Sequence, residues 1–139
     1  MRIAFGTDET TPVTEGIVGH LVAAGHDVVE VGTGEAWASV GRAVGTAVAS
    51  GAADRGIVCC WTGTGVSMAA NRIPGVRAAL CTDSETARGA RRWNDANVLA
   101  LGLRLTTATV AEEIVDVFLG DEEVDEAERS SIDLLDERT

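Results

Sequence analysis

The sequence predicts an α/β domain built as a doubly wound, five-stranded parallel sheet with helices on both faces. Short apolar runs alternate with amphipathic stretches along all 139 residues. Several of these runs, such as residues 56–60, are apolar at every position, which is typical of strands covered on both sides. Right-handed crossovers between parallel strands then place helices on both faces of one sheet.

Each element follows from a local signal. Apolar and β-branched runs predict the strands, in order at residues 3–5, 27–31, 56–60, 76–81 and 98–101. Amphipathic stretches between them predict helices at residues 13–24, 36–50, 66–71, 84–93 and 107–119, with a sixth, polar helix over 122–135. Thr11 as N-cap, Pro12 in the first turn and Gly25 after the last turn bound the first helix, and Gly51 ends the second.

The residue composition and net charge exclude several kinds of catalytic group and partner. All 11 basic residues are Arg, and the chain has neither Lys nor Tyr, so a Schiff-base lysine, a phosphate-loop lysine and a catalytic tyrosine are excluded. The net charge is −11, of which −7 falls in residues 121–139. We expect this segment to be a solvated acidic end of the domain formed by residues 1–120, and we expect no nucleic-acid partner, because binding a polyanion requires clustered cations.

The cysteines and histidines bear on the cellular compartment and on metal binding. Three cysteines argue against a disulfide framework, and no apolar run approaches the ~20 residues of a membrane span. We therefore expect a cytoplasmic protein with no membrane association. His20 and His26 are not near ligand-spaced cysteines, so we expect them to be structural and expect neither a metal site nor a cofactor.

The most informative stretch runs from Cys60 to Ser67. A strand delivers Cys60 to the sheet edge, and Gly63 and Gly65 let the backbone turn into a helix whose free amides face the crevice. Such amides bind a phosphate, a carboxylate or an enediolate oxygen, and they favour the thiolate of Cys60. Cys59 is interpreted as a buried strand cysteine, as is Cys81. Ligands of open parallel sheets bind at the carboxyl ends of the strands, so we expect the loop at 94–97 to contribute together with the loops at 6–11, 32–36, 61–65 and 82–83.

These residues resemble the ribose-5-phosphate isomerase B and galactose-6-phosphate isomerase family. The resemblance rests on Ile3-Ala4-Phe5-Gly6-Thr7-Asp8, the Thr-Gly-Thr-Gly-x-Ser-x-Ala-Ala-Asn core of residues 62–71, and Asn94-Asp95-Ala96-Asn97 with Arg104. It covers residues 2 to about 120. It implies a flavodoxin-like sheet, a homodimer or dimer of dimers with interfacial sites, and metal-independent aldose–ketose isomerisation through a cis-enediolate.

The resemblance also implies roles for individual residues. Cys60 is the base that moves the proton between C1 and C2, and Thr62 assists it. The turn formed by Gly63, Thr64 and Gly65, with Ser67, holds the enediolate oxygen. Asp8 and Asn94 bind the sugar hydroxyls, and Arg104 is associated with the phosphate end of the substrate.

The departures from the family pattern are as informative. The family's histidines are replaced by Glu9 and Trp93, and its phosphate-binding arginines fall on an acidic stretch where only Arg129 is near. Glu9 replaces a histidine in proton transfer only if burial beside Trp93 and Trp61 favours its protonated form. Trp37, Trp61 and Trp93 predict stacking on a sugar face, or else packing. Arg91 and Arg92 either compensate for the lost phosphate ligands or face solvent.

Three functions remain open from the sequence. The first is an aldose–ketose isomerase with Cys60 as base, acting on a sugar or sugar phosphate other than ribose 5-phosphate. The second is a non-catalytic sugar-binding member of the family, or an inactive partner subunit of a hetero-oligomeric isomerase. The third is thiol redox chemistry at Cys59 and Cys60, which ranks last because adjacent cysteines lack the two-residue spacing of oxidoreductases.

Overall fold

The computed structural model describes residues 1–137 and confirms the predicted order of strands and helices. The strands are β1 (Arg2–Thr7), β2 (Asp27–Glu30), β3 (Arg55–Cys60), β4 (Ala78–Leu80) and β5 (Val98–Gly102). The helices are α1 (Pro12–Ala23), α2 (Trp37–Ala49), α3 (Thr64–Ala70), α4 (Ser84–Asn94), α5 (Ala108–Phe118) and α6 (Arg129–Asp136), with a 3-10 turn, η1, at Glu126–Glu128. The main differences from the sequence prediction are a shorter β4 and an acidic segment that is irregular until η1.

The five strands form one parallel sheet in the order β2-β1-β3-β5-β4. β1 pairs with β2 on one side and with β3 on the other, so the winding direction reverses between β1 and β3. The register sets Thr7 opposite Cys59 and Cys60 opposite Gly102. The carboxyl ends of β1, β3 and β5 therefore meet at this switch point, where ligands of open α/β sheets bind.

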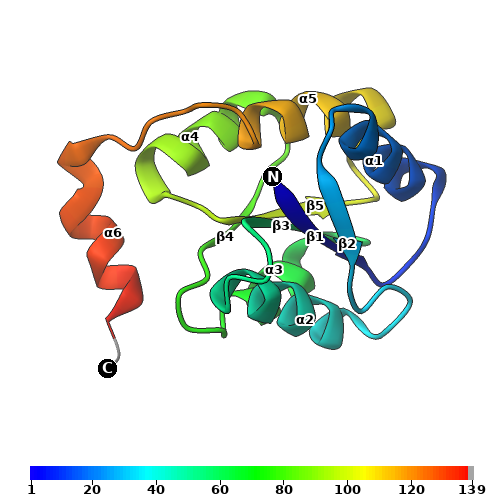
Figure 1. Cartoon of the computed structure of the whole chain (residues 1–139), viewed down its shortest axis with the longest axis horizontal. Coiled ribbons are helices and arrows are strands. Elements are labelled where there is room, and N and C mark those ends of the chain that lie inside the picture. The colour runs from blue at the N-terminus through cyan, green and yellow to red at the C-terminus, as the bar shows by residue number, and fades with distance from the viewer. Residues whose placement is uncertain (138–139) are drawn as a thin grey trace.

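Two helical layers cover the sheet (Figure 1). α1, α4 and α5 lie on one face, over a core that includes Phe5, Leu99 and Phe118. α2 and α3 lie on the other, over a core that includes Val44 and Val58. Alternate residues of β1, β3 and β5 enter opposite cores, which is why the buried stretches of these strands are apolar on both faces.

The C-terminal helix α6 projects beyond β4, away from the two layers (Figure 1). Ile132 is its one buried residue among those described. Asp95 connects it to the body: this residue has φ +47° and accepts ion pairs from Arg77 at 3.3 Å and from Arg91 at 3.2 Å, while Arg129 lies 3.8 Å away. α6 is thus attached at the amino end of the sheet, opposite the switch point. None of the helices within residues 1–137 is long and apolar enough to cross a bilayer.

Candidate active site

A cavity of about 400 Å³ opens at the switch point between β1 and β3. Asp8 follows β1, Cys60 ends β3, and the turn after Cys60 supplies several of the lining residues. The walls are largely apolar. The lining residues are Asp8, Trp37, Cys60, Trp61, Thr62, Thr64, Gly65 and Met68.

The turn that carries Thr62 to Gly65 is fixed by close packing against β5. Gly63 has φ +78°, and a Cβ there would lie 2.9 Å from the Gly102 nitrogen. A Cβ on Gly102 would in turn lie 2.6 Å from the Thr62 carbonyl oxygen. Leu103 donates its amide to the Cys60 carbonyl at 2.9 Å, and Arg104 does the same to the Trp61 carbonyl at 2.9 Å. The backbone that leaves Cys60 is therefore held against the end of β5 both by close packing and by hydrogen bonds.

The turn also leaves backbone amides available to a ligand. The first helical hydrogen bond of α3 is donated by Ser67 to the Gly63 carbonyl at 3.3 Å, so the amides of Thr64, Gly65 and Val66 precede it. No side chain within residues 1–137 caps these amides. α3 begins at Thr64, two residues earlier than expected, and has only seven residues. Local amides of this turn, rather than a long helix dipole, supply its hydrogen-bond donors.

The three thiols differ in their surroundings. Cys60 lines the cavity although only 5% of its surface is exposed, whereas Cys59 and Cys81 are fully buried. Burial raises the pKa of the Cys59 thiol, and the neighbouring Cys60 raises it further. Burial also raises the pKa of the Cys81 thiol to about 12, with Asp83 adding to the effect. Cys59 and Cys81 are thus interior residues, as expected from the sequence.

Polar groups accompany Cys60 in the cavity. The Thr62 and Thr64 hydroxyls are hydrogen-bonded to each other at 2.8 Å. Asp8 points one oxygen, Oδ1, into a buried position where it has no hydrogen-bond partner among residues 1–137. Leaving a buried carboxylate oxygen without a donor costs ~1–3 kcal/mol, so this position favours a ligand that brings a hydroxyl.

Three other predicted residues lie close to the cavity but do not line it. Glu9 is exposed, and its backbone, rather than its carboxylate, bonds the Thr7 hydroxyl. It thus lacks the burial that its expected role required. Ser67 is half-buried on α3. The Arg104 side chain is exposed, although its amide bonds to Trp61.

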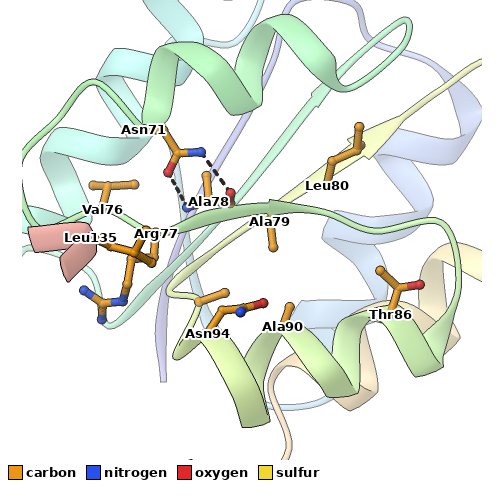
Figure 2. Close-up of a pocket in the computed structure, with 11 residues that line it drawn as sticks. Asn71, Val76, Arg77, Ala78, Ala79, Leu80, Thr86, Ala90, Asn94 and Leu135 are labelled. Atoms are coloured by element: carbon orange, nitrogen blue, oxygen red, sulfur yellow. Dashed lines mark hydrogen bonds between the residues drawn. The ribbon is translucent and has the colours of Figure 1, made fainter. Parts of the chain in front are cut away.

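The structure corrects the expectation for residues 94–97. This loop precedes β5, so it lies at the amino end of the sheet, where Asn97 accepts a hydrogen bond from the Gly56 amide and donates to the Arg77 carbonyl. Trp93 and Asn94 line a separate cavity on α4. Asn94 also faces a cavity of about 500 Å³ between α4 and the edge strand β4 (Figure 2). Within one chain these two residues do not meet Cys60.

The sequence did not single out Met68 as a cavity residue. Met68 follows Thr64 by four positions on α3, so helical spacing places the two on one face. Trp37, already predicted to lie near the crevice, begins α2. Its ring lies against Gly65, with ring carbons 2.8–3.3 Å from where a Gly65 Cβ would be. Trp37, Trp61 and Met68 are the large apolar side chains that line the cavity with Asp8 and Cys60.

A cysteine, a carboxylate and a turn of free amides at the switch point of a doubly wound sheet suit one class of enzyme: isomerases that move a proton between adjacent carbons through an oxyanion. Residues 3–135 match the family described as Ribose/Galactose Isomerase. The chain belongs to this family, and it is an aldose–ketose isomerase.

Relatives agree in sequence and in structure. The chain is 41% identical to ribose-5-phosphate isomerase B of Escherichia coli, over 86% of this chain and 83% of that protein. It is 34% identical to D-erythrulose-4-phosphate isomerase of Pectobacterium atrosepticum, over 86% and 82%. The structure of Clostridium thermocellum ribose-5-phosphate isomerase B superposes with a TM-score of 0.92 at 38% identity, over 98% of this chain and 95% of that one.

Proposed function

We propose that this protein interconverts an aldose phosphate and the corresponding 2-ketose phosphate through a cis-enediolate, with Cys60 as the base, and that its substrate is not ribose 5-phosphate. One observation carries the proposal: the Cys60 thiol, an Asp8 oxygen with no hydrogen-bond partner among residues 1–137, and the turn with free amides open on one cavity. The names of the relatives, which include ribose-5-phosphate, galactose-6-phosphate and D-erythrulose-4-phosphate isomerases, support sugar phosphates of four to six carbons as the substrate class.

The proton transfers balance with one base. The Cys60 thiolate takes the proton from C2 of the aldose, the C2–H electrons form the C1=C2 bond, and O1 takes the negative charge. The amides of Thr64 and Gly65 donate to that oxygen. A proton then passes from the C2 hydroxyl to O1. As the C2 carbonyl forms, C1 recovers the proton from the Cys60 thiol, and the thiolate is restored.

Thr62 and Asp8 position the substrate in this scheme. The Thr62 hydroxyl, fixed by Thr64, lies on the turn directly after Cys60 and relays the proton between the two substrate oxygens. Asp8 Oδ1 accepts a hydrogen bond from a substrate hydroxyl, a partner that residues 1–137 do not provide. Hydrogen bonds to charged groups contribute ~1.5–3 kcal/mol, so this contact fixes the substrate's orientation.

The phosphate end requires cations, and the described lining residues include none. We assign this role to Arg104, whose backbone is bonded to Trp61 at the same end of the sheet. Its guanidinium is exposed and extends from the loop after β5.

A second copy of the chain completes the site in this proposal. Trp93 and Asn94 lie at the far end of the sheet from Cys60, so they reach a Cys60 cavity only from a partner. Surface features favour pairing: Trp93, Leu134 and Leu135 are each more than half exposed. The cavity between α4, α6 and β4 provides a concave surface beside them (Figure 2).

The test is solvent-proton exchange at C2 of the substrate, measured by NMR in heavy water. Cys60→Ser and Cys60→Ala are expected to abolish exchange, whereas the matched control Cys81→Ser, at a buried thiol outside the cavity, is expected to retain it. Undiminished exchange in the Cys60 variants would remove this residue from the mechanism. Saturable sugar-phosphate binding with no exchange in the wild-type protein would support the non-catalytic alternative instead.

A further inference from the structure

We infer that the substrate is acyclic: an aldose phosphate, such as a tetrose 4-phosphate, whose ring-closing hydroxyl is esterified or absent. This inference rests on the proposed isomerase function and names its substrate class. It follows from the proton-carrying groups that the cavity holds and from the work each has to do.

The cavity holds two titratable side chains among residues 1–137, Cys60 and Asp8. Both histidines of the chain are engaged elsewhere. His20 on α1 is 2.6 Å from Asp116 on α5, in the helical layer across the sheet from α2 and α3. His26, before β2, lies 3.3 Å from the amino terminus. The groups that usually transfer protons near neutral pH are thus located away from the cavity.

A cyclic sugar needs an additional proton transfer before isomerisation. Opening a hemiacetal removes a proton from the anomeric hydroxyl and delivers one to the ring oxygen, so a group that both accepts and donates protons must lie beside the ring. In the proposed scheme Cys60 is committed to C1 and C2, and Asp8 is committed as an acceptor to a substrate hydroxyl. Glu9 is exposed and outside the cavity.

The large apolar side chains that line the cavity cannot carry out this step. Trp37, Trp61 and Met68 present rings and a thioether. The proposed contribution of a second copy, Trp93 and Asn94, adds an indole and an amide, neither of which titrates. Such a lining packs against the C–H groups of an extended chain and leaves ring opening to the solvent.

Four-carbon sugar phosphates avoid the problem by their own chemistry. In a tetrose 4-phosphate O4 is esterified, and O3 would close only a four-membered ring, so the molecule presents its carbonyl directly. A pentose 5-phosphate closes a furanose through O4. If its open form is on the order of 1% of the total, an enzyme that accepts only that form loses about 100-fold in apparent affinity.

The test uses a matched pair of substrates. D-Ribose 5-phosphate forms a ring, whereas its 4-deoxy analogue has the same length and phosphate but cannot. We expect kcat/KM to be at least ~100-fold higher for D-erythrose 4-phosphate, and higher also for the 4-deoxy analogue, than for D-ribose 5-phosphate. Equal or greater kcat/KM for D-ribose 5-phosphate than for both open-chain compounds overturns the inference.

If D-ribose 5-phosphate is faster than one open-chain compound and slower than the other, a second experiment decides: the conversion rate of D-ribose 5-phosphate is measured with the enzyme in excess. If only the open form is accepted, the conversion rate reaches a plateau at the spontaneous ring-opening rate and stops rising with enzyme concentration. A rate that continues to rise in proportion to enzyme shows that the protein opens the ring, and the inference is then wrong. Absence of turnover and of C2 exchange with all three compounds is a different outcome, which contradicts the proposed function itself.

Discussion

Gly102→Ala tests whether the contact between β5 and the Cys60 turn holds the catalytic geometry. The added Cβ would lie 2.6 Å from the Thr62 carbonyl oxygen and 2.8 Å from its carbon, whereas ordinary contact begins at 3.4 Å. The turn must therefore move by about 0.8 Å, since β5 is a central strand that cannot yield. Overpacking of this kind costs ~1–3 kcal/mol of stability. A shift of this size at reacting groups lowers kcat by about 100-fold.

The assay pairs urea unfolding with kcat on the best sugar phosphate. Gly19→Ala on α1 is the matched control, because a Cβ there has nothing within 4 Å. Alanine in a helix is expected to stabilise that variant by ~0.5–1 kcal/mol without changing kcat. A Gly102→Ala protein that folds with wild-type stability and kcat would show that Thr62 has no fixed position to lose.

Two further predictions follow from the same structure. At pH 8 iodoacetamide is expected to label one thiol, Cys60, in the folded protein and three thiols after unfolding. The reason is that burial raises the pKa of the Cys81 thiol to about 12 and also raises the pKa of the Cys59 thiol. Rapid labelling of two or more thiols in the folded protein would contradict this prediction. Asn71→Ala is expected to lower the free energy of unfolding by about 1 kcal/mol per lost hydrogen bond. The Asn71 side chain donates to the Ala78 carbonyl at 2.9 Å and accepts from the Ala78 amide at 2.8 Å, on the free edge of β4. An unchanged denaturation midpoint would show that water fully replaces these two hydrogen bonds.

The sequence determined the fold because the two patterns that predict it, apolar strands and helix caps, are both local. Strands buried on both faces must be apolar throughout, and helix ends need specific caps, so residues 56–60 and the Thr11-Pro12 pair predict their elements without knowledge of the rest. The α1 boundaries confirm this: Thr11 accepts from the Thr14 amide and forms a capping box. The length of β4 was overestimated at its start, residues 76–77. The reason is tertiary: the Arg77 amide donates to the Asn97 side chain at 2.8 Å, a contact that no local pattern reveals.

The sequence also placed Cys60, Thr62, Thr64, Gly65 and Asp8 at one sheet edge, since each follows or ends a strand whose carboxyl end must lie there. Only the tertiary structure decided which neighbours share the cavity with them. The direction of the chain puts Trp93 and Asn94 at the opposite end of the sheet, and the packing of α2 on α3 brings Trp37 onto Gly65. Such contacts join residues far apart in the chain, and their distances depend on how whole helices pack rather than on any local pattern.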